Sequence, residues 1–137
     1  MKTIVAYKSK SGYTKRYAEW IAQELGCDIK ENPELSDVLG YDTIIYGGGM
    51  YAGGFNGGKL ITKNLDKLSG KKIVLFAVGS NPGRENEMKV FWDRLLTAEQ
   101  QKYIGYFYLR GGFDFDKLTA KDKVLMKMLK VQAPENK

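Results

Sequence analysis

Short runs of apolar, β-prone residues alternate with segments of helical periodicity, and this alternation constrains the fold more than any other feature. The run 73–78 is continuously apolar, which is typical of a strand buried on both faces of a parallel sheet. Runs at 2–7, 43–46 and 104–109 have a similar character, and 27–30 could form a further short strand. Because strands that alternate with helices imply right-handed crossovers, the sequence predicts an α/β fold with a doubly wound sheet.

The segments between these runs show the period of amphipathic helices. The first has apolar residues at helical spacing from Tyr17 to Leu25 and a stop at Gly26. Residues 60–68 and 88–96 predict two more helices, and 33–39 predict a turn or a short helix. Further elements are expected near the end of the chain, where 118–131 predict a last helix and 132–137 a frayed tail. We find neither repeats nor a linker, so residues 1–137 are expected to form one domain.

The composition excludes several kinds of chemistry. Cys27 is the only cysteine among 137 residues and there is no histidine, which rules out an intrachain disulfide, a Cys/His zinc site and any Ser-His or Cys-His catalytic pair. Any redox chemistry must therefore come from a bound cofactor. The first apolar run turns polar at Lys8, too early for a signal-peptide core, so we expect a reducing, cytoplasmic location.

The net charge of +6 is concentrated toward the end of the chain. Residues 110–137 carry seven basic and four acidic side chains. Val124, Leu125, Met128 and Leu129 lie at helical spacing among lysines, a pattern that would suit weak association with a membrane surface. A last crossover helix packed on the sheet has the same pattern, and we favour it. A nucleic-acid partner would rest on charge alone and is not predicted.

Hydroxyl residues and a glycine follow the first predicted strand. Ser9, Ser11 and Thr14 surround Gly12 directly before the first helix. Glycine allows a tight turn and the helix N-terminus adds partial positive charge, so hydroxyls and amides could converge on a phosphate. The alternative is an ordinary turn in which Ser11 only caps the helix. The segment lacks the Gly-Lys-Ser/Thr ending of a Walker loop and the G-x-G-x-x-G of dinucleotide folds.

Two further glycine clusters follow later strands. Residues 47–54 come after the third predicted strand and 79–83 after the fourth. Both clusters would lie at the edge of the sheet where ligands bind in open α/β folds. Glycine permits close approach to a flat ligand, and Met50 and Tyr51 offer faces on which a ring can stack. Each cluster could instead be a surface loop, but three clusters at successive strand ends favour a ligand site.

The sequence resembles the flavodoxin family over nearly its whole length. Residues 9–14 match the family's phosphate-loop pattern Ser/Thr-x-Ser/Thr-Gly-x-Thr at every specified position. The resemblance implies a flavodoxin-like three-layer αβα sandwich, with five parallel strands in the order 2-1-3-4-5 and FMN as cofactor. It also implies that 48–54 and 79–82 flank the isoalloxazine ring, and that a backbone carbonyl of 48–54 accepts a hydrogen bond from flavin N5. The predicted cofactor-binding residues are Ser9, Lys10, Ser11, Gly12, Tyr13, Thr14, Gly48, Gly49, Met50, Tyr51, Ala52, Gly53, Gly79, Ser80, Asn81 and Pro82.

The chain also departs from typical flavodoxins, which leaves its function open. Those carriers are acidic, whereas this chain is basic, and its residues 80–82 offer no aromatic for a second flavin face. Residues 106–112 and the basic end are somewhat similar to flavodoxin-type protoporphyrinogen oxidases. We predict an electron carrier that serves redox partner proteins or a small organic acceptor. The alternative is an FMN-dependent oxidoreductase acting on a quinone or a porphyrinogen-type substrate.

No side chain is expected to act as a catalytic acid or base, because the flavin would supply the chemistry. A binding or regulatory module without flavin is a third interpretation. Response-regulator receivers share the predicted architecture, but Lys8 and Lys10 stand where they need acidic residues.

Overall fold

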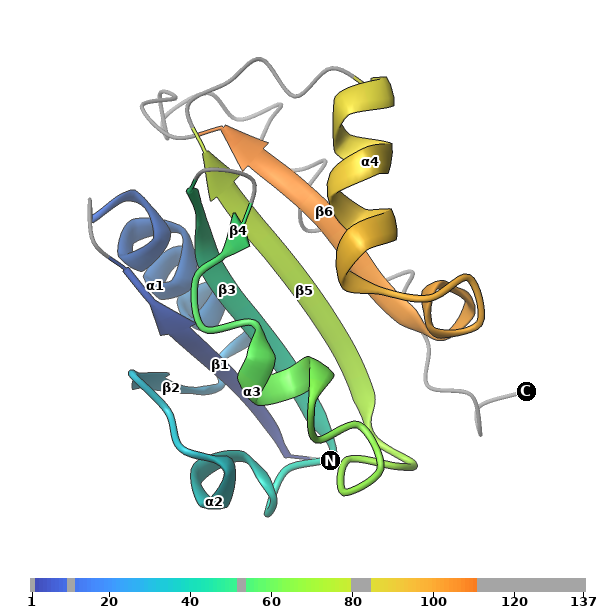
Figure 1. Ribbon diagram of the computed structural model, residues 1–137. Helices are drawn as coiled ribbons and strands as arrows, with labels where there is room; N and C mark the ends of the chain where they lie inside the picture. The colour runs from blue at the N-terminus through green and yellow to red at the C-terminus, as the bar shows by residue number, and fades with distance from the viewer. Residues whose placement is uncertain (1, 10–11, 52–53, 80–84, 111–137) are drawn as a thin grey trace.

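A parallel sheet forms the centre of the protein, and its strands lie in the order β2-β1-β3-β5-β6 (Figure 1). The computed structural model describes residues 2–9, 12–51, 54–79 and 85–110. The strands are β1 (Thr3–Lys8), β2 (Asp28–Glu31), β3 (Thr43–Tyr51), β4 (Gly54–Phe55), β5 (Lys72–Gly79) and β6 (Ile104–Arg110). The two-residue β4 pairs antiparallel with the end of β3, so the five parallel strands confirm the predicted fold class and strand order.

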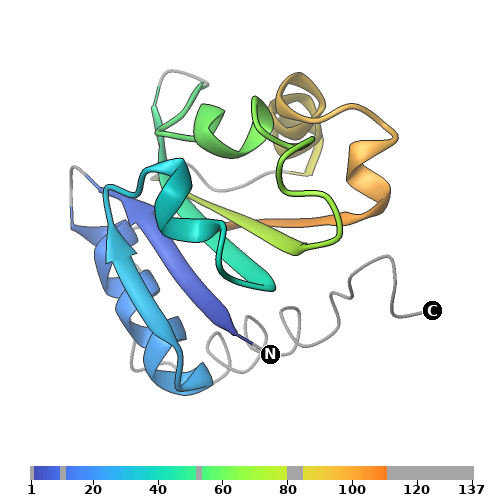
Figure 2. The ribbon, with the colours of Figure 1, turned by 90° about the horizontal axis from the view of Figure 1, so that it is seen from below.

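Helices cover both faces of the sheet. The helices are α1 (Tyr13–Leu25), α2 (Leu35–Val38), α3 (Lys59–Thr62), α4 (Glu85–Leu95) and the 3-10 turn η1 (Gln100–Lys102). Figure 2 shows α1 on one face, and α3 and α4 on the other. Thus the layers expected from alternating strands and helices are present on both sides of the strands.

The core consists of two clusters, one on each face. Alternate residues of β3 divide between them, because Ile44 and Tyr46 face α3 and α4 while Ile45 faces α1. In β5, Leu75 and Phe76 divide in the same way and both are fully buried. This two-sided burial explains why the central strands read as continuous apolar runs rather than as alternating ones.

The helix α1 confirms the first amphipathic segment and its stop. Its buried side chains follow helical spacing from Tyr17 to Ala22. Gly26 has φ 62° and its N–H donates to the carbonyls of Ala22 and Gln23, as a glycine at a helix C-terminus commonly does. The apolar face of α1 lies on β1, β3 and β5, so this helix fixes the position of the turn that precedes it.

The strand β3 is longer than the sequence suggested, since it continues to Tyr51 rather than ending at Tyr46. Residues 47–49 were predicted to belong to a loop, but they pair with β1 as far as Gly48 and with β5 as far as Gly49. A side chain at Gly47 would overlap the ring of Phe76 from the neighbouring strand. The glycine therefore makes room for a large core side chain, and the strand continues past it.

The third helix is shorter than predicted. The sequence indicated helical periodicity over 60–68, but α3 ends at Thr62 and turns follow. The side-chain amide of Asn64 donates to the Leu60 carbonyl at 2.8 Å, so a side chain takes the acceptor at the helix end. Ile61 and Leu68 are still buried, because the turns carry the same apolar residues into the core.

The predicted helix at 118–131 and the frayed tail at 132–137 lie outside the described residues. Within the described part of the chain, no helix has the length and apolar character needed to cross a membrane.

Candidate functional site

The carboxyl ends of β1, β3 and β5 lie side by side at one edge of the sheet (top of Figure 1). Lys8 is in register with Gly48, and Gly49 is in register with Val78. The next residue of β5, Gly79, pairs with Arg110 at the end of β6. The structure thus brings the three segments that the sequence singled out to a single edge, where the strand order also reverses between β1 and β3.

The turn between β1, which ends at Lys8, and α1, which begins at Tyr13, leads into the N-terminus of that helix. The Ser9 hydroxyl oxygen accepts a hydrogen bond from the Gly12 N–H at 3.0 Å. Gly12 has φ 91° and ψ −16° and stands directly before the helix, in a backbone region that favours glycine. Its carbonyl accepts from the N–H of Arg16 at 3.1 Å, which closes the first turn of α1.

The groups at this helix end suit an anion. The first turn consists of Tyr13, Thr14 and Lys15, so it carries a hydroxyl and an ammonium but no carboxylate. A basic side chain opposes the helix dipole at this end, whereas a bound anion would complement both the dipole and the lysine. Thr14 is 1% exposed, so its side chain is buried at the start of the helix. The donor set therefore fits a phosphate monoester.

The phenols near this edge keep their protons at neutral pH. Burial raises the pKa of Tyr7, and the charges of Glu31 and Glu19 raise it further. Burial also raises the pKa of Tyr17, with a smaller contribution from Tyr108. These phenols therefore add no negative charge to the edge at which α1 begins.

The end of β3 positions the second group of predicted residues. Gly48 and Gly49 lie within the strand, and Met50 and Tyr51 pair with Phe55 and Gly54 of β4. Met50 is partly buried and packs against the cluster beneath α3 and α4. A side chain at Gly48 would overlap the backbone carbonyl of Asn56. Packing within the chain thus explains why residue 48 is a glycine, and a contact of Gly48 with a ligand stays a prediction.

Tyr108 is a residue of this edge that sequence reasoning missed. A Cβ placed on Gly79 would lie 2.8 Å from the Tyr108 hydroxyl oxygen and 3.4 Å from Met50 Cβ. Hence Met50 of β3, Gly79 of β5 and Tyr108 of β6 lie close together at this edge. The available signal was positional, since Tyr108 occupies the carboxyl-terminal half of the last predicted strand.

Several predicted site residues lie outside the described ones. These are Lys10 and Ser11 of the first turn, Ala52 and Gly53 after β3, and Ser80, Asn81 and Pro82 after β5.

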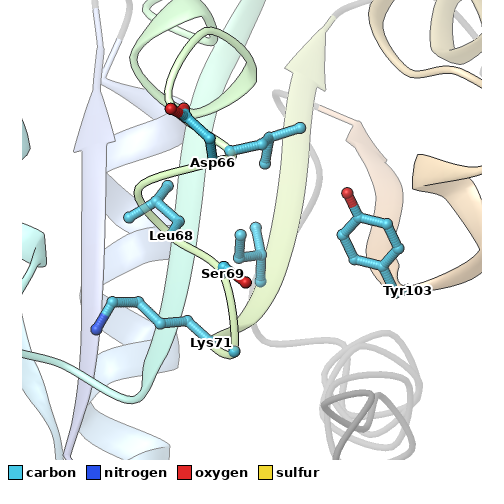
Figure 3. Close-up of a pocket in the computed structure, with 8 residues that line it drawn as sticks. Asp66, Leu68, Ser69, Lys71 and Tyr103 are labelled. Carbon is cyan, nitrogen blue, oxygen red and sulfur yellow. The ribbon is translucent and has the colours of Figure 1, made fainter.

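A pocket of about 690 Å³ lies at the opposite edge of the sheet. Figure 3 shows it between the turn that carries Asp66 and Ser69 and the ring of Tyr103. This turn precedes β5, and Tyr103 precedes β6, so the pocket is at the amino ends of the strands. Lys71 uses its ammonium to donate to the carbonyls of Leu39 and Tyr41. The pocket is therefore separate from the edge at which α1 begins.

The doubly wound parallel sheet, with a helix N-terminus at the carboxyl end of its first strand, places the protein among the open α/β folds. A family profile described as a flavodoxin domain matches residues 4–137. The chain therefore belongs to the flavodoxin domain family. Comparison with curated protein sequences gives no match.

Solved structures share the fold of this chain. Oxidised flavodoxin 2 from Bacillus cereus has a TM-score of 0.60 and 21% identity, with 95% of this chain and 99% of that chain covered. The Trp repressor binding protein from Bacillus subtilis has a TM-score of 0.66 and 16% identity, with 96% and 98% covered. An NADH:FMN oxidoreductase in its apo form has a TM-score of 0.59 and 17% identity, with 98% and 93% covered.

Proposed function

We propose that this protein binds FMN non-covalently at the carboxyl edge of its sheet and carries electrons between redox partners. The observation that carries the proposal is the turn from β1 to α1, where Ser9, Gly12 and Thr14 stand at a helix N-terminus in a chain of the flavodoxin domain family. When bound, FMN would supply one- or two-electron chemistry. The protein's own part is to bind and orient it.

The phosphate end and the ring end of the cofactor would use different residues. The helix N-terminus with Thr14 and Lys15 would hold the phosphate through charge and N–H donors. Met50 would lie against the ring, since its thioether is polarizable and adapts to aromatic faces. The backbone at the end of β3 would exclude water on that side.

The test is a comparison of FMN with riboflavin, which has the same ring but no phosphate. We would titrate the purified full-length protein with each flavin and follow absorbance and fluorescence quenching. The proposal predicts tight binding of FMN and much weaker binding of riboflavin. Equal affinities would place the phosphate away from α1, and an absence of binding to either flavin would end the redox interpretation.

Steady-state turnover separates a carrier from an enzyme. A carrier reduced by a flavodoxin reductase would pass electrons to a protein acceptor and show no saturable turnover with small substrates. Saturable oxidation of a porphyrinogen or reduction of a quinone by the FMN-loaded protein would instead identify the oxidoreductase.

A redox titration adds a second measurement, because reduced flavin is anionic. The net charge of +6 should make its potential less negative than in acidic flavodoxins.

A further inference from the structure

The hydroxyl of Tyr46 donates a hydrogen bond to the backbone that follows β4. Tyr46 lies on β3, is 1% exposed, and donates to the backbone carbonyl of Asn56 at 2.8 Å. Asn56 directly follows β4, the short strand that folds back along the end of β3. Its own N–H donates to the carbonyl of Gly49 at 2.8 Å. Asn56 is therefore held to β3 through both sides of its backbone, by one main-chain bond and one side-chain bond.

Glycines make this arrangement possible. A side chain at Gly48 would overlap the Asn56 carbonyl and approach Phe55 Cε1 to 3.1 Å. Gly57 has φ 75°, and a side chain there would overlap the Tyr46 hydroxyl and lie 3.2 Å from Lys8 Cδ. The Asn56 carbonyl is thus packed between the Gly48 backbone and the Tyr46 phenol. Two glycines from separate elements leave space for the same hydrogen bond.

The anchored residue controls the segment that faces the candidate site. Met50 pairs with Phe55 and Tyr51 pairs with Gly54, so a shift of Asn56 moves both sides of the β3–β4 hairpin. Phe55 is itself held by an edge-to-face contact with the Tyr46 ring at 5.7 Å between centroids. Tyr46 therefore positions the hairpin twice, through its hydroxyl and through its ring.

We propose that Tyr46 is a positioning residue for the flavin: through Asn56 it sets where the end of β3 presents Met50 and its backbone to the ring. This inference rests on the proposed FMN binding. Tyr46 lies beneath the hairpin and is buried, so it would act through Asn56 and not by contact with the flavin. Burial raises the pKa of its phenol above the ordinary value, so the hydroxyl remains a donor throughout the physiological pH range.

The test is Tyr46→Phe, which keeps the ring and its contact with Phe55 and removes only the donor. The control is Tyr106→Phe, because the hydroxyl of this partly buried tyrosine donates to Gln101 Oε1 at 2.9 Å on the same face of the sheet. For both variants and the wild type we would measure hydrogen exchange of the Asn56 amide in the apo protein, the Kd for FMN and the flavin midpoint potential. Circular dichroism would confirm that each variant is folded.

We expect faster exchange of the Asn56 amide and a rise in the Kd for FMN of about threefold to tenfold in Tyr46→Phe, as the loss of one hydrogen bond implies. The midpoint potential should shift as well, since the ring environment changes, and Tyr106→Phe should leave all three quantities near wild type. Wild-type Kd and potential in Tyr46→Phe would overturn the inference. So would equal changes in the two variants, which would indicate a general loss of stability.

Two further results distinguish a failure of the proposed FMN binding from a failure of the Tyr46 inference. If the wild type binds no FMN, the proposed function and this inference both fail, while the exchange data still report on the anchor. If Tyr46→Phe does not fold, Gly48→Ala displaces the same Asn56 carbonyl from the other side and should likewise weaken FMN binding. Unchanged FMN binding in a folded Gly48→Ala variant would contradict the inference.

Discussion

Lys15→Glu should stabilise the protein and weaken its binding of FMN, two effects of opposite sign. Lys15 is exposed and is the third residue of α1. A glutamate there would complement the positive end of the helix dipole, and we expect a gain in unfolding free energy of about 0.3–1 kcal/mol at low ionic strength. The same carboxylate would repel a phosphate held at this helix end.

The loss of affinity can be estimated from Coulomb's law. Two unit charges roughly 8 Å apart in water interact by about 0.5 kcal/mol, and salt at 0.1 M screens this by about half. The substitution changes the side-chain charge by two units against a phosphate of about −2, so the expected loss is about 1 kcal/mol. This corresponds to a roughly fivefold higher Kd. A higher salt concentration should reduce the effect.

The matched control is Lys67→Glu, which makes the same change in net charge at an exposed residue of the turn before β5. Urea unfolding would measure stability, and fluorescence quenching would measure the Kd for FMN and for riboflavin. The expected pattern is weaker FMN binding in Lys15→Glu alone, with riboflavin binding unaffected in both variants. Equal Kd values for FMN in the two variants would refute the placement of the phosphate at α1.

Three further predictions concern the stability of the fold. Gly47→Ala should lower the unfolding free energy by about 1–3 kcal/mol, because its methyl group would overlap the buried Phe76 ring; chemical denaturation would measure it, and partial rescue by Phe76→Leu would confirm the cause. Gly12→Ala and Gly70→Ala should each lower the unfolding free energy by about 1 kcal/mol, because both glycines have positive φ while the space around the added methyl group is open. Wild-type stability of these variants in the same assay would contradict these backbone conformations. The unfolding free energy should fall as pH rises above about 10, because burial raises the pKa of Tyr46 in the folded state only and the unfolded state then loses this proton first. The expected loss from Tyr46 alone is up to about 1.4 kcal/mol per pH unit. In alkaline denaturation, Tyr46→Phe should lack this share of the loss.

Periodicity predicted the sheet and α1 well because those signals are local. The continuous apolar run of β5 and the apolar face of α1 can both be read from neighbouring residues, and both follow from burial. The sequence indicated an apolar strand over 73–78, and β5 extends beyond this run by one residue at each end. The turn before α1 was also predictable, since hydroxyl residues and a glycine stand directly between a strand and a helix.

The end of β3 was not predictable, because its cause lies in other elements. Gly47 is paired on both sides and covered by a ring from β5, and Gly48 is opposed by the backbone that follows β4. Phe76 is far from Gly47 in the sequence, and Asn56 meets Gly48 only because β4 folds back along the end of β3. The predicted length of α3 was wrong for a different reason. The side-chain amide of Asn64 takes a backbone acceptor at the end of this helix, while the apolar spacing in the sequence continues. Apolar residues that the sequence assigned to this helix are in the core, but the backbone between them is not helical throughout.

The surroundings of each glycine decide what it says about a ligand. At Gly47, Gly48 and Gly79 an added side chain would meet Phe76, Asn56 or Tyr108, so packing within the chain is sufficient to explain their small size. At Gly12 nothing lies within 4 Å of an added Cβ, and φ 91° alone requires glycine. The glycine clusters at the ends of β3 and β5 therefore carry less weight for FMN than the sequence suggested. The argument for a bound phosphate depends on the β1–α1 turn, which is why the perturbation of Lys15 is the most direct test.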